Sequence, residues 1–129
     1  MTRSRVVVDS SGWIEVFTNG VQADAFLALM ADESSLVVPT ISIFEVVKWV
    51  RREHGEAQAI QAAAAMQRAQ VVDLDMRLAL AAAQLSQALR LPMADSIILA
   101  TARDQQARLY TMDSDFRGIA DVEWIAATP

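Results

Sequence analysis

Cysteine is absent from this chain of 129 residues, and lysine and histidine occur once each. Without cysteine the protein has neither disulfides nor thiolate metal sites. No apolar run approaches the roughly 20 residues that cross a bilayer. The three valines that follow Arg3 and Arg5 are too few for the apolar part of a signal peptide. We therefore expect a soluble cytoplasmic protein with no membrane partner.

The composition predicts one folded domain that spans residues 1–129. Hydrophobic residues make up 53% of the chain and charged residues 21%, which argues against disorder. The net charge is −5, and arginine supplies ten of the eleven basic residues. This is the wrong sign for a typical nucleic-acid-binding protein. Either a nucleic acid is contacted by a few arginines, or the partner is something else.

Short apolar runs alternate with helical patterns along the chain. Strands are predicted at residues 5–8, 36–38, 71–72 and 108–111, with a weaker fifth at 122–125. Helices are predicted at residues 10–17, 23–30, 57–69 and 76–89, with two more that begin near Thr40 or Ser42 and just before Asp95. Such alternation indicates a parallel sheet covered on both faces. We predict a three-layer α/β/α sandwich with a mostly parallel sheet of about five strands.

Four acidic residues lie where loops meet these elements. Asp9 follows three valines, and Glu45 lies in the helix that opens after Pro39. Asp95 is in the first turn of a later helix, and Asp113 follows the fourth strand. Carboxylates at the ends of parallel strands point into the crevice where open α/β sheets bind ligands. Several of them cannot all stay ionised without a cation, so we expect Mg²⁺ or Mn²⁺ and metal-dependent phosphoryl transfer.

Each acidic residue also has an ordinary structural interpretation. Asp9 could be a helix N-cap, and Asp95 matches the usual preference for acids in a first helical turn. Asp113 and Asp115 could form a turn after a strand. Taken together at successive sheet edges, these acids are hard to explain by capping alone.

Glu45 differs from the others because of its neighbours. Ile41, Phe44 and Val47 suggest that its helix packs on the sheet, which would place Glu45 near the buried side. A glutamate there is costly unless it is paired or metal-bound. If the helix instead places Glu45 at the surface, its position implies neither a charged partner nor a metal ion.

Four segments of the chain resemble the PIN-domain nucleases, and most closely the VapC-type toxins of bacterial toxin–antitoxin pairs. In order they are VVDSSGW (7–13), PTISIFEV (39–46), LPMADSIILA (91–100) and TMDSDF (111–116). The third and fourth segments are the specific ones, whereas the first alone is weak. The resemblance covers nearly the whole chain.

This resemblance implies a catalytic quartet of Asp9, Glu45, Asp95 and Asp113, with Asp115 as a secondary acid. It implies hydrolysis of RNA phosphodiester bonds with Mg²⁺ or Mn²⁺ held chiefly by Asp9 and Asp95. It also implies a homodimer, or a hetero-oligomer with a small VapB-type antitoxin whose C-terminal segment blocks the acidic pocket. An arginine of the antitoxin would enter the carboxylates and compete with the metal.

Basic residues that could hold the substrate are few. Lys48 and Arg52 lie three and seven residues after Glu45, so helical geometry places them on roughly the same face. We expect them to contact phosphates that flank the scissile bond. They could equally form a solvated helix end with salt bridges to Glu53 and Glu56.

Aromatic residues and the lone histidine have mainly structural interpretations. Trp13 and Phe17 are spaced i and i+4, so they belong to the core or to an apolar surface for a dimer or antitoxin. His54 precedes Gly55 and reads as a helix C-terminal residue rather than a base or ligand.

Rival functions fit the sequence less well. A haloacid-dehalogenase-like phosphatase needs an Asp-x-Asp pair after its first strand, and Ser11 occupies the second position. A response-regulator receiver domain needs paired acids and a late lysine, whereas the only lysine is Lys48. A catalytically silent PIN-like binding module and a stand-alone nuclease without an antitoxin remain as alternatives.

Overall fold

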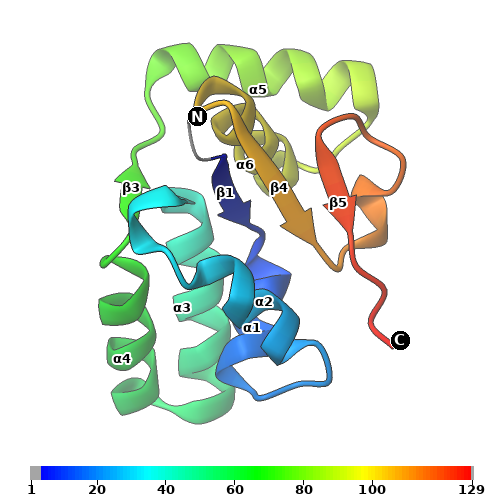
Figure 1. Ribbon diagram of the computed structural model, residues 1–129. Coiled ribbons are helices and arrows are strands. Elements are labelled where there is room, and N and C mark those ends of the chain that lie inside the picture. Colours follow the sequence, from blue (N-terminus) through cyan, green and yellow to red (C-terminus); the bar gives the residue numbers. More distant parts are fainter. Residues whose placement is uncertain (1–3, 129) are drawn as a thin grey trace.

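Five parallel strands form the centre of the molecule. The structure is a computed structural model that describes residues 4–128. In chain order the strands are β1 (Arg5–Val8), β2 (Leu36–Pro39), β3 (Gln70–Val72), β4 (Ala107–Thr111) and β5 (Val122–Trp124). Their order in the sheet is β3-β2-β1-β4-β5, and each neighbouring pair is parallel. Figure 1 labels four of these strands, β3, β1, β4 and β5. The predicted α/β architecture is confirmed.

Helices cover both faces of this sheet. They are α1 (Ser10–Phe17), α2 (Ala23–Met30), α3 (Thr40–His54), α4 (Glu56–Met66), α5 (Met76–Leu89) and α6 (Met93–Asp104), with short 3₁₀ turns η1 (Glu33–Ser35) and η2 (Ser114–Phe116). None of the helices within residues 4–128 is both long and apolar enough to cross a membrane.

Alternate strand residues belong to two separate cores. Val8 and Val38 pack in the core that includes side chains of α1 to α4. Val7 and Val37 pack with residues of α6 in the other core. Successive residues of a strand point to opposite faces, so both faces of the sheet must be apolar when helices cover both. Consecutive residues of these strands are therefore apolar, as in the valines at residues 6–8, instead of alternating with polar residues.

Gly12 lets the first turn of α1 lie close to its neighbours. A Cβ atom at this position would lie 2.5 Å from Val8 Cγ1 and 2.7 Å from Phe26 Cε1. Both distances are shorter than carbon atoms tolerate, so α1 can approach β1 and α2 this closely only without a side chain here. The position of α1 matters for the site because Asp9 immediately precedes the helix.

Helix α3 differs in detail from the prediction. It begins directly after Pro39, with no side-chain capping bond, so neither Thr40 nor Ser42 is the cap. Its buried face contains Ser42, Val46 and Val50, whereas Phe44 is 60% exposed. The expectation that Phe44 packs on the sheet was wrong, because the helix places the 42-46-50 row inward.

The helix predicted at residues 57–69 is also shorter than expected. In the structure α4 ends at Met66, and residues 67–69 turn toward β3 instead of continuing the helix. The run is rich in alanine, which favours a helix but carries no stop signal. The strand that follows begins at Gln70, one residue earlier than predicted.

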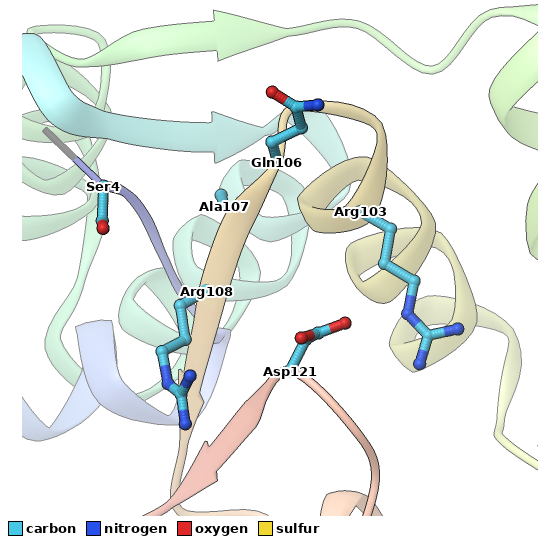
Figure 2. A pocket seen from close by; sticks show the side chains of 6 residues that line it. All are labelled: Ser4, Arg103, Gln106, Ala107, Arg108 and Asp121. Carbon is cyan, nitrogen blue, oxygen red and sulfur yellow. The ribbon is translucent and has the colours of Figure 1, made fainter. Parts of the chain in front are cut away.

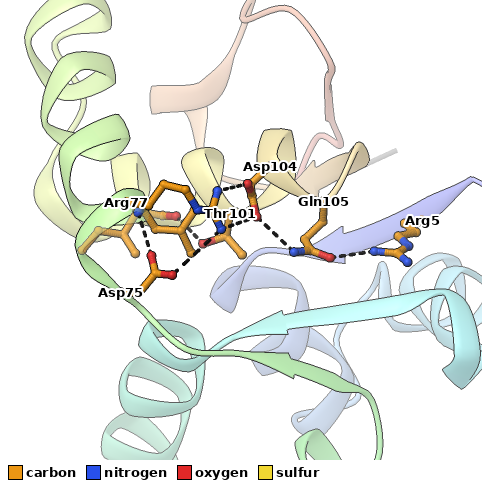
Figure 3. A network of polar contacts seen from close by, with 8 residues as sticks. Arg5, Asp75, Arg77, Thr101, Asp104 and Gln105 are labelled. Atoms are coloured by element: carbon orange, nitrogen blue, oxygen red, sulfur yellow. Dashed lines mark hydrogen bonds and ion pairs between the residues drawn. The ribbon is translucent and has the colours of Figure 1, made fainter.

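A polar network joins α5, α6 and β1 near the amino ends of the strands. Arg77 contacts both Asp75 and Asp104, Gln105 donates to Asp104, and Arg5 donates to Gln105 (Figure 3). Arg77 is largely exposed, so each such pair contributes little to stability. The network lies away from the edge of the sheet where the acidic residues gather.

Candidate active site

The acidic residues predicted from the sequence meet at one edge of the sheet. Asp9 follows β1, Glu45 lies on α3 just beyond β2, and Asp113 follows β4. Asp95 is in the first turn of α6. Since all five strands are parallel, their carboxyl ends share one edge, and this is the edge at which open α/β sheets bind ligands.

Asp95 is the electrostatic centre of this group. Burial, followed by the negative charges of four other carboxylates, raises the pKa of Asp95 to about 7. In order of decreasing effect, those carboxylates belong to Asp9, Asp113, Glu45 and Asp115. The other three predicted site residues and Asp115 therefore all lie near enough to Asp95 to act on it, and we refer to the five as the acidic cluster. Without a metal, Asp95 is partly protonated near neutral pH because burial and the neighbouring negative charges both disfavour its ionised form.

Three of the carboxylates are close enough to share one cation. Asp95, Asp113 and Asp115 each offer an oxygen that lies within 4.8 Å of the others. Asp115 reaches this position through η2, in which its backbone N–H donates a 2.9 Å hydrogen bond to Asp113 Oδ1. The family resemblance implied only a secondary role for Asp115. Its signal was the Asp-x-Asp spacing in the turn that follows β4.

Asp9 is held rigidly beside this group. It is 3% exposed, and its Oδ2 accepts 2.9 Å hydrogen bonds from both Ser11 Oγ and Thr111 Oγ1. Burial raises the pKa of Asp9, while these two hydrogen bonds oppose the rise. Asp9 occupies the N-cap position of α1, yet its side chain makes no capping bond. Its carboxylate is therefore held by Ser11 and Thr111 and does not cap the helix.

Ser11 and Thr111 also connect the ends of β1 and β4. The backbone N–H of Met112 donates to Ser11 Oγ at 3.1 Å, and that of Asp113 donates to Thr111 Oγ1 at 2.9 Å. Each hydroxyl thus accepts from the loop after β4 and donates to Asp9. The position of Asp113 is coupled to that of Asp9 through Thr111.

Glu45 is oriented from the neighbouring helix. Ser10 Oγ donates a 2.7 Å hydrogen bond to Glu45 Oε1, which joins α1 to α3. Ser10 is buried, and Glu45 is half-buried. Ser10, Ser11 and Thr111 were not predicted as site residues. Their only signal was that each hydroxyl lies within two positions of a predicted acid.

The two predicted basic residues lie beside Glu45. They border a shallow cavity of about 190 Å³, which is lined by Phe44, Glu45, Lys48, Trp49 and Arg52. Arg52 Nε also lies 3.3 Å from Glu53 Oε1, so the salt bridge to Glu53 in the alternative interpretation is present.

A larger cavity, of about 580 Å³, lies at the opposite edge of the sheet. Figure 2 shows its lining: Ser4, Arg103, Gln106, Ala107, Arg108 and Asp121. Its two arginines are already engaged, Arg103 with the carbonyl of Ala120 and Arg108 with Glu123. It contains none of the predicted site residues, and it adjoins the amino ends of β1 and β4.

A third cavity, of about 470 Å³, lies between α1, α3 and α4. It is lined by Phe17, Val50, His54, Gln58, Gln61, Ala62 and Ala65. Trp13 is 4% exposed and belongs to the core, whereas Phe17 is 37% exposed and packs against Trp13. His54 ends α3 and lies against the ring of Trp49, as expected for a structural histidine.

Solved structures with the same fold include several toxin–antitoxin proteins. A chain of a toxin–antitoxin complex from Klebsiella pneumoniae is 26% identical, with 92% of this chain and 95% of that chain covered and a TM-score of 0.76. The VapC20 toxin of Mycobacterium tuberculosis, described as cleaving the sarcin–ricin loop, is 17% identical over 89% and 95% of the two chains, with a TM-score of 0.70. A DNA-bound VapBC complex from Salmonella typhimurium is 14% identical over 97% and 99%, with a TM-score of 0.73.

The comparison with protein families agrees with the site. The family described as "PIN domain" matches residues 6–122 and so includes every acidic residue of the cluster. A search of curated protein sequences found no match. The family match extends over far more than half of the chain, and the resemblance inferred from its four motifs is confirmed. The protein belongs to the PIN-domain family.

Proposed function

We propose that this protein is a metal-dependent endoribonuclease that acts as the toxin of a toxin–antitoxin pair. The observation that carries the proposal is the gathering of four other carboxylates around the partly buried Asp95, whose pKa is raised to about 7 by burial and by their charges. Such repulsion is unfavourable for the fold alone, and strongly perturbed groups of this kind cluster at functional sites. Membership of the PIN-domain family and the toxins among the structural relatives support the same reading.

The residues present fit a hard divalent cation. The cluster offers carboxylate oxygens and no sulfur, which is the donor set that Mg²⁺ and Mn²⁺ prefer. Asp95, Asp113 and Asp115 would hold the ion, since their oxygens are already close together. Asp95 also belongs to the ligand pair predicted from the sequence. Asp9, the other member of that pair, adds negative charge and a fixed carboxylate beside the trio.

The chemistry follows from these carboxylates. A bound divalent cation lowers the pKa of water and offsets the charge that builds on a phosphodiester during attack. The protein's own part is to hold its acids in fixed positions and to accept the proton of the attacking water at a carboxylate. Glu45, which accepts a hydrogen bond from Ser10 and is not one of the three proposed ligands, is the candidate for that proton. Lys48 and Arg52 would bind phosphates on the side of α3.

The first experiment is cleavage of total cellular RNA by the purified protein, free of any antitoxin. The reaction is run with Mg²⁺, with Mn²⁺ and with EDTA, and in parallel with Asp9→Asn and with the control Asp73→Asn, an exposed loop residue. We expect discrete fragments that vanish with EDTA and with Asp9→Asn but persist with Asp73→Asn.

Two outcomes would overturn the proposal. If folded protein that binds Mn²⁺ leaves every RNA intact, the protein is a PIN-like binding module without nuclease activity. If fragments persist in EDTA and with Asp9→Asn, the cleavage comes from a contaminant or from another site. Cleavage by the protein without any antitoxin encoded beside it would favour a stand-alone nuclease.

The antitoxin would be a small protein whose C-terminal segment reaches the carboxylates with an arginine. The cavity between α1, α3 and α4, which contains Phe17 and His54, offers it a place to dock. An inhibitory partner should therefore lose affinity when Gln61, on the lining of this cavity, is replaced by Arg. Copurification of wild-type protein and Gln61→Arg with the product of the neighbouring gene tests this expectation. Equal recovery of both would rule out this cavity.

A second copy of the chain would cover the outer face of α5. Met76 and Leu80 on this helix are 79% and 64% exposed, and Leu74, two residues before the helix, is 43% exposed. No charged residue occurs between Arg77 and Arg90, so the outer face of this helix is uncharged for most of its length. Exposed apolar surfaces of this kind mark protein interfaces, and a homodimer is the association that the resemblance implied.

A further inference from the structure

Phe44 is an exposed aromatic residue beside the candidate active site. It directly precedes Glu45 on α3, and its side chain is 60% exposed. Together with Glu45 it lines the shallow cavity of about 190 Å³ on this helix. A phenylalanine this exposed gains little from folding, because most of its ring stays in water. The exposure calls for an explanation outside the core.

The cavity beside this ring contains two cations, Lys48 and Arg52, and the carboxylate of Glu45. Lys48 Nζ lies 5.6 Å from the centroid of the Phe44 ring, close enough for a cation–π contact. Within residues 4–128, Lys48 makes no ion pair with an acidic side chain. By contrast, Arg51 forms a two-bond pair with Glu56, at 2.6 and 3.2 Å. The only lysine of this acidic chain therefore has no acidic partner in the described part of the chain, and its ammonium group lies beside an exposed ring.

Helical geometry aligns the ring with two cations. Phe44, Lys48 and Arg52 are spaced by four residues, so they form one row along α3. At 1.5 Å of rise per residue, the row extends roughly 12 Å from the acidic cluster toward the end of the helix. A flat aromatic face beside a row of cations is how proteins bind single-stranded nucleic acids, with bases stacked and phosphates paired.

We propose that Phe44 is a stacking platform for an RNA base next to the scissile phosphate, with Lys48 and Arg52 binding the phosphates that follow. This inference rests on the proposed nuclease function, and it adds a base-binding subsite to it. It also explains how a chain of net charge −5 can bind RNA. The basic contacts are confined to one row of α3, and the base contributes affinity that needs no charge.

A protein partner is the other occupant that an exposed phenylalanine could have. The centres of protein interfaces are depleted of charged residues. Here the ring is bordered by a lysine, an arginine and a glutamate of the acidic cluster, all within one cavity. The position beside Glu45 favours a substrate over a second protein. A protein partner is nevertheless an outcome that the experiment distinguishes.

The test measures binding of a fluorescein-labelled, mixed-sequence single-stranded 12-nucleotide RNA by fluorescence anisotropy. Ca²⁺ replaces Mg²⁺, because it also takes oxygen ligands, and a gel verifies that the RNA stays intact. The variants are Phe44→Ala, Phe44→Tyr and Lys48→Gln. Ile60→Ala is the matched control, since Ile60 is 61% exposed on α4, away from the cavity. Each variant is measured over a series of salt concentrations.

Stacking and charge have different signatures in this assay. Phe44→Ala should weaken binding about 10-fold at every salt concentration, with no change in the slope of log affinity against log salt. Phe44→Tyr should restore most of the loss, because it keeps a ring. Lys48→Gln should reduce the slope by about 0.7, as expected for one lost phosphate contact with a single strand. Ile60→Ala should match the wild type.

The outcomes separate this inference from the proposed function. If wild-type protein cleaves RNA while Phe44→Ala binds and cleaves it equally well, the stacking platform is wrong and the nuclease stands. If wild-type protein cleaves no RNA but binds it in a way that depends on Phe44, the nuclease proposal fails and the subsite stands. If Phe44→Ala changes only the mass of the protein in sedimentation, the ring belongs to a protein interface and the inference fails.

Discussion

Thr111 Oγ1 donates a 2.9 Å hydrogen bond to Asp9 Oδ2, and the two residues are 102 positions apart in the chain. Asp9 lies at the end of β1 and Thr111 at the end of β4, the two strands that pair in the middle of the sheet. Thr111 is fully buried and also accepts from the backbone of Asp113. One hydroxyl therefore fixes the relative positions of two acids of the site.

Replacing Thr111 by valine keeps its shape and removes this hydrogen bond. A buried carboxylate that loses a donor destabilises the fold, here by about 1–3 kcal/mol. The lost bond also raises the pKa of Asp9 further, so Mn²⁺ should bind more weakly at neutral pH. Urea unfolding and titration with Mn²⁺ measure the two effects. Thr111→Ser, which retains the hydroxyl, should recover most of both, and equal losses with serine and valine would contradict the assignment.

The metal-free protein should lose stability as the pH rises from about 4 to 7. The pKa of Asp95 is raised from 3.8 to about 7 in the folded state. Between these values the folded protein keeps a proton that the unfolded chain has released, so rising pH favours unfolding. The raised pKa of Asp9 acts in the same direction.

Asp95→Asn tests the origin of that pH dependence. It removes the titrating group and much of the repulsion, so the urea midpoint at pH 8 should rise and vary less between pH 4.5 and 8. Asp73→Asn, in an exposed loop, serves as the control and should keep the wild-type profile. A profile for Asp95→Asn that parallels the wild type would show that Asp95 is not the group responsible.

Ser10→Ala should lower activity more than stability. The variant removes the 2.7 Å hydrogen bond to Glu45 Oε1, so Glu45 is no longer held at one orientation. We expect kcat for RNA cleavage to fall about 10-fold, as for other groups that orient a site residue, with the unfolding free energy within about 1 kcal/mol of wild type. Ser34→Ala, at an exposed position in η1, is the control. Unchanged kcat in Ser10→Ala would mean that Glu45 is positioned by other contacts.

Gly12→Ala should destabilise the protein although alanine favours helices. The added Cβ would meet Val8 and Phe26 at distances below 3 Å, so α1 must shift or the core must strain. Overpacking of this kind costs about 1–3 kcal/mol. Thermal unfolding measures the loss, and Gly20→Ala is unsuitable as a control because its Cβ would meet Glu15. Ala79→Gly, on the exposed side of α5, gives the ordinary cost of a helical glycine for comparison, about 1 kcal/mol.

Leu80→Glu should convert a dimer into a monomer. Leu80 is 64% exposed on the outer face of α5, where a glutamate would place a charge within the proposed contact. Sedimentation velocity should report half the wild-type mass, with unchanged helix content. Ile60→Glu, equally exposed on α4, should leave the mass as it was. A monomeric wild type, or a dimer that tolerates Leu80→Glu, would exclude this face.

The parts of the fold that followed from the sequence are those set by local patterns. The valine-rich run that ends at Asp9 predicted β1. Asp113 likewise follows a predicted strand, so it was expected at the same edge of the sheet as Asp9. The carboxyl ends of parallel strands lie at the same edge of a sheet, so acids that follow such strands in the sequence come close together in the fold. The family resemblance then supplied the roles of the acids, which remain proposals.

The parts that did not follow depend on orientation. In α3 apolar residues occur on nearly all sides of the first two turns, so their spacing alone could not decide whether Phe44 or Val46 faces the sheet. Apart from their closeness to Asp9 and Asp113 in the sequence, no pattern marked the hydroxyls of Ser11 and Thr111 as groups of the site. The bonds from Thr111 to Asp9 and from Met112 to Ser11 join residues that are 102 and 101 positions apart, and only the pairing of β1 with β4 brings these residues together.

The order of the strands has a consequence for how the chain acquires its structure. β1 is made first, yet it lies in the centre of the sheet, and its neighbour β4 begins only at Ala107. Contacts this distant in sequence slow folding, because a long loop must close before they form. Asp9 therefore gains its hydrogen bond from Thr111 only after most of the chain has left the ribosome. The acidic cluster therefore cannot assemble on a growing chain until β4 has been synthesised and has paired with β1.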